Sequence, residues 1–201
     1  MLEAALDLIA EGGLTRATLA RIGERAGYSR GLADYHFDSK SALVRQVVLL
    51  VARRWAQGLA ARNLHELRGI DALATVVDLY MAQLEEDPRE FQVLYVLTGE
   101  SVSIAPDIKA HIAHHDELFR RHLQGWIIEA KDDGTIRADV ETVAASVLIE
   151  GLLRGVAYQW LLSPSAFRPT AMTPLLLDTL LSSLGRPSGI MSHVLRASRD
   201  I

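Results

Sequence analysis

Residues 18–37 read TLARIGERAGYSRGLADYHF, and this stretch predicts two short helices joined by a tight glycine turn. Thr18 is a favourable N-terminal cap, because its hydroxyl can accept from backbone N–H groups that have no partner inside a helix. Gly27 follows the first helix at the place where a left-handed cap favours a residue without Cβ. Ser29 can cap the second helix, so the chain would enter that helix directly after the turn.

The two predicted helices share a small apolar core. The first helix should run over about 19–25 and turn inward the residues that recur three and four positions apart, which are Leu19, Ile22, Gly23 and Ala26. The second helix should turn Ala33 and Phe37 toward the same core, because these two are also four positions apart. Its other side chains are then left for solvent or for a partner.

Helix pairs of this kind place the start of the second helix in the major groove of DNA. Arg30, Gly31 and Leu32 lie in the first turn of that helix and are the candidate readers of bases. Arg30 could fork onto guanine, and Leu32 could touch a thymine methyl. Donors that can reach phosphate oxygens lie further along the chain, at Tyr35, His36 and Lys40. The spacing alone leaves a second interpretation open, an ordinary helical hairpin with solvated arginines.

The stretch and its flanks resemble the TetR/AcrR family of transcriptional regulators. The matching residues are Thr18, Ile22, Ala26, Gly27, Ser29, Gly31, His36, Phe37, Lys40, Ala42 and Leu43. The resemblance covers roughly the first 45 residues. It implies an all-α fold, with a three-helix helix-turn-helix domain over 1–45 (motif 18–37) and a larger helical bundle over 46–201 for ligand binding and dimerisation.

The function that the resemblance implies is that of a dimeric regulator of transcription. We expect a repressor that binds a double-stranded DNA operator and is released by a small-molecule effector. The DNA contacts assigned on this interpretation are Thr18, Ser29, Arg30, Gly31, Leu32, Tyr35, His36 and Lys40.

Two positions depart from the family pattern. A large aliphatic residue followed by tyrosine is usual where this chain has Ala33 and Asp34. Ala33 implies a slightly emptier core, filled by Tyr28 or Leu32. The carboxylate of Asp34 would repel phosphate, so we expect it to pair with a nearby arginine rather than to accept from a cytosine amino group. The chain also opens directly on an amphipathic helix at Leu2, without a basic lead-in, so no arm in the minor groove is predicted.

Charge is divided unevenly along the 201 residues. Residues 1–62 hold nine Lys and Arg against six Asp and Glu, whereas residues 63–201 hold twelve against nineteen, so a net charge of +3 is followed by −7. A nucleic-acid surface is therefore expected on the N-terminal part alone, and two copies would be needed for tight binding at physiological salt. The chain has no cysteine and no long uncharged apolar run, so we expect a cytoplasmic protein without disulfides or a membrane segment.

Helical periodicity continues through the rest of the chain. The expected helices lie at about 41–63, 69–86, 90–97, 107–131, 140–162 and 175–184, and a proline-rich loop is expected over 163–174. The helices over 140–162 and 175–184 are apolar around most of their circumference. We expect them to pair with their counterparts in a second copy as a four-helix homodimer interface, the alternative being burial within the domain.

Aromatic side chains are spread over the predicted regulatory helices. A mostly apolar effector pocket between these helices is expected from the aromatic residues as a set, although core packing is the more common role for any one of them. The predicted lining consists of Trp55, Tyr80, Tyr95, Trp126 and Tyr158. No cofactor is expected.

A metal-dependent enzyme in a helical bundle is the alternative function. His111 and His115 are four positions apart and share a helix face, and His122 lies two turns further on. The chain lacks the paired Glu-x-x-His motifs that di-metal bundles need, and Arg120 and Arg121 bring positive charge to the cluster, so no metal site is assigned. A nucleoid-type DNA binder without an effector is a third possibility, which predicts weak sequence discrimination.

Overall fold

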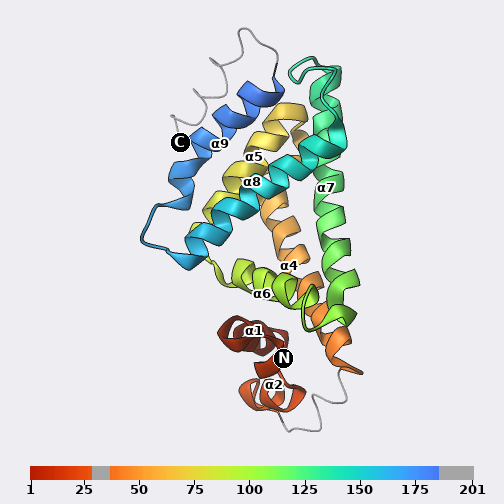
Figure 1. Cartoon of the computed structure of the whole chain (residues 1–201), viewed down its shortest axis with the longest axis vertical. Coiled ribbons are helices and arrows are strands. Elements are labelled where there is room, and N and C mark those ends of the chain that lie inside the picture. Colours follow the sequence, from red (N-terminus) through yellow and green to blue (C-terminus); the bar gives the residue numbers. More distant parts are fainter. Residues whose placement is uncertain (29–36, 186–201) are drawn as a thin grey trace. The chain divides into compact units, whose positions relative to one another are not determined.

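The structure, a computed structural model, describes residues 1–28 and 37–185. Most of this part of the chain is helical (Figure 1), in α1 (Leu2–Arg16), α2 (Leu19–Arg25), α4 (Lys40–Ala61), α5 (Gly69–Glu86), α6 (Arg89–Ser101), α7 (Lys109–Asp132), α8 (Thr142–Leu162) and α9 (Pro169–Leu184). Short 3-10 turns precede α5 and α7, at Leu64–Glu66 and Pro106–Ile108. Within the described residues the only β pairing is one isolated bridge, between Ile136 and Gly185. The all-α prediction is confirmed.

The chain forms two compact units. The first contains residues 1–56 and 87–117, and therefore holds α1, α2, α6, most of α4 and the start of α7. The second contains residues 57–86 and the chain from 118 onward, and therefore holds α5, α8, α9 and the remaining parts of α4 and α7. These compact units do not test the predicted functional division into a DNA-binding domain over 1–45 and a ligand-binding and dimerisation domain over 46–201, which stays a prediction.

Apolar stripes on α1, α2, α4 and α6 meet in the core of the first unit. The side chains at its centre recur three or four positions apart on the longer helices, as amphipathic helices require, and include Leu6, Ile9, Ile22, Leu43, Val44, Val47, Val93 and Leu97. Phe37 is buried in the same cluster, as the sequence predicts. Helix α1 is interrupted near its end, where Gly12 and Gly13 leave helical geometry and Gly13 has a φ of +68°.

The turn after α2 closes through local hydrogen bonds. Gly27 has a φ of +76°, in the left-handed region that the sequence predicts for it. The N–H of Gly27 donates to the carbonyl oxygen of Glu24 at 3.1 Å, and the N–H of Tyr28 donates to the carbonyl oxygen of Gly23 at 2.8 Å. These two bonds form a Schellman motif, which gives partners to carbonyls at the end of a helix. The direction in which the chain leaves α2 is therefore set by residues within the turn itself.

In the second unit, α9 lies beside α5 (Figure 1). The carboxylate of Glu85, near the end of α5, accepts from the backbone N–H of Thr170 at 3.0 Å and from the Thr170 hydroxyl at 2.6 Å. Arg168 also binds this carboxylate, at 2.7 Å. Thr170 lies in the first turn of α9, where backbone donors lack partners inside the helix. The hydrogen bonds from Thr170 and then Arg168 lower the pKa of Glu85 from its ordinary value of 4.5 to about 2.

Two predicted helix boundaries are wrong. Helix α6 covers Arg89–Ser101, beyond the predicted 90–97, because its last turn is stabilised by the buried Ser101, whose hydroxyl donates to the Thr98 carbonyl oxygen at 2.8 Å. Helix α9 begins at Pro169 and not near 175, because a proline needs no N–H partner at the first helical position and Glu85 binds the next residue. Pro174, expected in a loop, lies inside α9. The other predicted helices that lie in the described residues agree closely with the structure, whereas the predicted helix after Ser29 lies outside them.

Replacing Gly27 with alanine should lower the free energy of unfolding by about 1 kcal/mol, because a side chain strains a left-handed backbone. Urea unfolding measures this change. Gly125→Ala is the control, since Gly125 lies inside α7 and an added Cβ meets no atom within 4 Å at either position. The control should raise the free energy of unfolding by roughly 0.5–1 kcal/mol, because alanine favours a helix over glycine. Changes of the same sign in both variants would contradict the left-handed role of Gly27.

Glu85→Gln should lower the melting temperature at neutral pH, because it removes the charge that Thr170 and Arg168 stabilise. The folded pKa of Glu85 lies below its ordinary value, so the charged carboxylate stabilises the folded state above about pH 4.5 and loses this effect as the pH falls toward 2. The difference in melting temperature between wild type and variant should therefore shrink over that interval in a thermal unfolding series. Glu86→Gln, on the exposed neighbour, should show no such dependence. A difference for Glu85→Gln that stays constant down to pH 2 would exclude this linkage.

Candidate functional site

The structure describes the first half of the candidate DNA-binding motif. Helix α2 starts after Thr18, whose hydroxyl accepts the backbone N–H of Arg21 at 3.3 Å, so the predicted cap is confirmed. Helix α2 packs on α1, with Ile22 and Gly23 buried and Arg21 exposed. The absence of a side chain at Gly23 suits this close packing.

Most of the predicted DNA-contacting residues lie outside the described residues. These are Ser29, Arg30, Gly31, Leu32, Tyr35 and His36, together with the departures at Ala33 and Asp34. Two of the predicted contacts, Thr18 and Lys40, have described positions, and both are exposed. Thr18 caps α2, and Lys40 is the first residue of α4. Contact of these residues with DNA remains a prediction.

Helix α4 has an N-terminal cap that was not predicted from the sequence. The hydroxyl oxygen of Ser39 accepts the backbone N–H of Ala42 at 3.0 Å, and Ser39 directly precedes Lys40. A serine just before an apolar helical run is the usual signal for such a cap, but Ser41 fits the same signal two positions later. The cap holds the backbone that carries the exposed Lys40.

Some of the positive charge of the first unit is bound to a carboxylate of the same unit. Arg25 donates to both carboxylate oxygens of Glu11, at 2.9 and 3.1 Å, and Arg16 lies 3.7 Å from the same group. The hydrogen bond from Arg25 lowers the pKa of Glu11, and that bond raises the pKa of Arg25. These groups are exposed, so the pairing adds little stability. It does mean that fewer of the nine Lys and Arg side chains of residues 1–62 present unneutralised charge than their number suggests.

Helix α8 presents an apolar stripe to solvent. The large exposed side chains of this stripe are Val143, Val147, Leu148, Tyr158 and Leu162. Helix α9 differs, because its buried side chains include Leu176, Leu177, Leu180 and Leu184. Burial within the domain therefore applies to most of α9 but not to the α8 stripe. In the described part of the chain, no helix has the length and apolarity needed to cross a membrane.

The five residues of the predicted effector lining are divided between the two units. The first unit holds Trp55 and Tyr95, and the second holds Tyr80, Trp126 and Tyr158. The ring of Tyr80 lies 6.5 Å from that of Phe119, and the ring of Trp126 stacks on His122 at 6.1 Å. Tyr158 belongs to the exposed α8 stripe. The role of these five residues in ligand binding stays a prediction.

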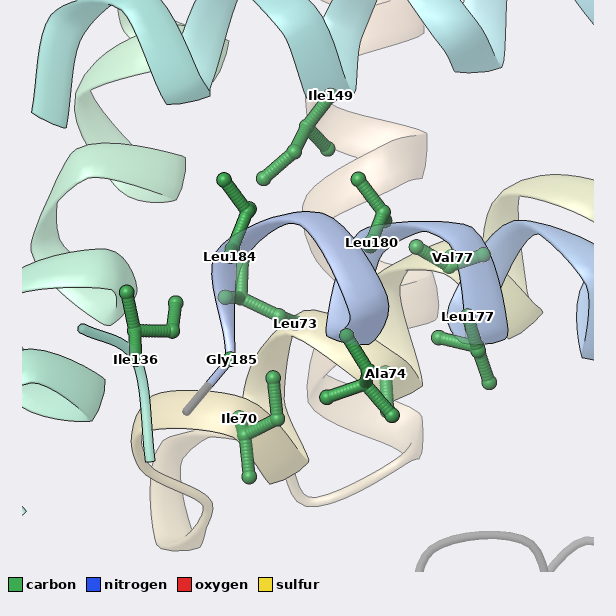
Figure 2. Close-up of a pocket in the computed structure, with 11 residues that line it drawn as sticks. Ile70, Leu73, Ala74, Val77, Ile136, Ile149, Leu177, Leu180, Leu184 and Gly185 are labelled. Atoms are coloured by element: carbon green, nitrogen blue, oxygen red, sulfur yellow. The ribbon is translucent and has the colours of Figure 1, made fainter. Parts of the chain in front are cut away.

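A small cavity of about 20 Å³ lies in the second unit. Figure 2 shows the residues that line it. Its wall is apolar and comes mainly from α5, α8 and α9, through side chains that include Leu73, Val77, Ile149, Leu177, Leu180 and Leu184. The predicted aromatic residues do not line it. A volume of this size holds about one water molecule, so a larger ligand would need these helices to separate.

The histidines of α7 take part in separate contacts. Nε2 of His111 lies 3.1 Å from the hydroxyl oxygen of Ser41, and Nδ1 of His115 lies 3.5 Å from a carboxylate oxygen of Asp116. His122 stacks on Trp126. Among residues 1–28 and 37–185, no group of three His, Asp or Glu side chains is arranged to hold a metal ion. This geometry does not favour the enzyme alternative.

Comparison with known proteins points to one family. Residues 1–47 match the family described as bacterial regulatory proteins, tetR family. The chain is also similar to a curated protein of Escherichia coli K12 named "Probable acrEF/envCD operon repressor", with 21% identity over 191 residues that cover 90% of this chain and 83% of the relative.

Two solved regulators share the fold. The fatty acid degradation regulator FadR from Bacillus halodurans superposes with a TM-score of 0.80 at 21% identity, over 91% of this chain and 97% of that one. SmeT, the repressor of the Stenotrophomonas maltophilia multidrug efflux pump SmeDEF, superposes with a TM-score of 0.75 at 23% identity, over 93% and 89% of the two chains. The complex of SmeT with triclosan gives a TM-score of 0.79.

The family match and the geometry concern the same residues. The matched segment contains the Thr18 cap, the left-handed Gly27 and the buried Phe37, which together frame a helix-turn-helix motif. The curated relative aligns with nine tenths of the chain and is named as a repressor. Residues 1–47 therefore form a DNA-binding segment of the tetR family of bacterial regulatory proteins, and the curated relative that aligns with most of the chain is named as an operon repressor.

Proposed function

We propose that this regulator is an operator-binding repressor whose hold on DNA is released by a small molecule. The observation that carries the proposal is the helix-turn-helix frame inside residues 1–47, where Thr18 caps α2 and Gly27 turns the chain. The similarity to a named operon repressor supports repression rather than activation. Such a protein works on the chromosome, so the proposal places it in the cytoplasm.

The proposal assigns reading and positioning to different residues of the DNA-binding domain, 1–45. Arg30, Gly31 and Leu32 would face base edges from the start of the helix that Ser29 caps. Phosphate would be bound by Thr18 at the start of α2, by Tyr35 and His36, and by Lys40 at the start of α4. The exposed positions of Thr18 and Lys40 at two helix starts support this assignment, because helix N-termini favour anions.

The larger bundle, 46–201, would join two copies. An apolar stripe like that of α8 is a liability in a monomer, and a symmetric contact between two copies removes it from water. Leu175, the large apolar side chain that α9 exposes, would add to this interface over 140–162 and 175–184. A two-fold dimer also supplies two reading helices for successive major grooves, about 34 Å apart.

The effector would bind inside the bundle. The predicted lining of Trp55, Tyr80, Tyr95, Trp126 and Tyr158 suits a mostly apolar molecule, as does the apolar cavity of the second unit. Triclosan, which SmeT binds, is a precedent in a structure of the same fold. A ligand wedged between helices would move α4 and so change the separation of the two reading helices.

Buried polar groups of the second unit could anchor such a ligand. Nε1 of Trp160 and Oγ1 of Thr173 are buried, and neither has a hydrogen-bond partner among the described residues. A buried polar atom without a partner is costly, so a ligand atom that bonds to it gains more than the same contact would gain at the surface.

Selection from random duplex DNA should recover one preferred operator, and variants should then separate the assigned roles. Arg30→Ala should relax the preference at one position, by about 1–3 kcal/mol between right and wrong bases. Lys40→Ala should weaken binding to all sequences and lower the salt slope by about 1. Arg68→Ala is the control, because Arg68 is 84% exposed in the second unit. If Arg30→Ala and Lys40→Ala both weakened binding equally to all DNA sequences, the assignment of roles would be overturned. Repeating the binding measurement with candidate apolar ligands tests whether a ligand releases the protein from DNA.

Val147→Glu should convert the dimer into monomers at micromolar concentration, because it places a charge in the middle of the α8 stripe. Sedimentation velocity measures the mass, and operator affinity should fall with it. Val102→Glu is the control, since Val102 is 72% exposed in the loop after α6 and lies outside the stripe. A Val147→Glu protein that remains dimeric would place the interface elsewhere.

A further inference from the structure

Helix α6 binds α1 through side chains at several levels along both helices, although α6 lies outside the 47 residues that the family match covers. At the start of α6, Arg89 donates to Asp7 at 2.8 Å and to Glu3 at 2.9 Å. Further along, Nε2 of Gln92 donates to the carbonyl oxygen of Ala10 at 3.1 Å. Both helices belong to the first unit, so these contacts lie within one compact body.

At the end of α6, Glu100 binds the backbone of α1. Both of its carboxylate oxygens accept the N–H of Leu14, at 3.0 and 3.2 Å. A Cβ on Gly13 would overlap the same carboxylate, so the glycine is what allows Glu100 to come so close. The φ of +68° at Gly13 is itself unfavourable for residues with a side chain.

Gln92 binds the carbonyl oxygen of Ala10 and Glu100 binds the N–H of Leu14. These two backbone groups lie on either side of the interruption of α1. In a continuous helix the N–H of Leu14 would donate to the carbonyl oxygen of Ala10, four residues earlier. At the break over Gly12 and Gly13, the Ala10 oxygen instead accepts from Gln92, and the Leu14 N–H donates to Glu100. Side chains of α6 thus replace one backbone hydrogen bond of α1.

The break matters for DNA binding because the chain leads from it directly into the motif. Leu14 and Ala17 are buried immediately after the break, and Thr18 then caps α2. The path of these few residues sets where α2 begins, and α2 is the first helix of the motif. The hydrogen bond from the Leu14 N–H to Glu100 fixes the backbone here, and so also helps to fix the position where α2 begins.

We infer that α6 is part of the DNA-binding framework and that Glu100 and Gln92 are positioning residues for operator binding. They act through the backbone of α1 and touch no DNA themselves. The inference rests on the proposed operator-binding function and extends it to residues far from the family motif. Glu100 carries most of this role, because its bond is to the residue that leads into α2.

The test compares Glu100→Ala with Glu100→Gln on the selected operator, at one salt concentration. Glu100→Ala should weaken binding about tenfold, because the Leu14 N–H loses its acceptor. Glu100→Gln keeps a neutral acceptor and should stay within about threefold of wild type. Both variants remove the same negative charge, so simple electrostatics would instead tighten binding to DNA equally in both. Glu86→Ala, on an exposed residue of the second unit, is the control and should leave affinity unchanged.

Folding is checked separately, by circular dichroism and by the active fraction in a stoichiometric titration. The amide hydrogen of Leu14 should exchange with solvent faster in Glu100→Ala than in Glu100→Gln. A folded Glu100→Ala protein with wild-type affinity would overturn the inference, as would equal losses in the Ala and Gln variants. If the wild type itself selects no duplex, the proposed function fails; if it selects one that Glu100→Ala binds equally well, only the positioning role fails.

Discussion

Helix ends impose the constraint on which much of this structure depends, because the first N–H groups and last carbonyls of a helix have no partners inside it. Among the helices of residues 1–28 and 37–185, three follow residues whose side chains accept these N–H groups, namely Thr18 for α2, Ser39 for α4 and Glu141 for α8. Glu141 accepts from Ala144 and Val143, and these bonds lower its pKa. Each cap helps to determine where a helix starts.

Other backbone groups find partners only through residues far along the chain. Glu85 binds Thr170 at the start of α9, and Glu100 binds Leu14 where α1 is interrupted. Carboxylates suit this role because an ionised acceptor forms a stronger hydrogen bond than a neutral one. In both cases a single side chain connects two helices and also sets the path of the chain at a break or a start.

Some of these contacts join residues close together in the sequence, and others join residues far apart. The hydrogen bonds of the turn at Gly27 come from α2 and the turn itself, so the direction in which the chain leaves α2 is set locally. The entry into α2 depends on α6, which lies some seventy residues later in the chain. The apolar stripe of α8 involves neither the Gly27 turn nor α6. Its exposure in a single copy of the chain is the argument for a second copy that covers it.

The all-α class, the capped α2, the left-handed Gly27 and the burial of Phe37 could all be predicted from the order of residues, because caps, turns and helical spacing are signals within a few positions. The resemblance to the family could be recognised in the same way, since the matching residues lie within the first 47 positions. The packing of the α9 leucines inside their own unit and the start of α9 at Pro169 became evident only from the folded chain. Burial and the acceptor for Thr170 come from another helix, 85 residues away in the chain, and no local pattern contains that information.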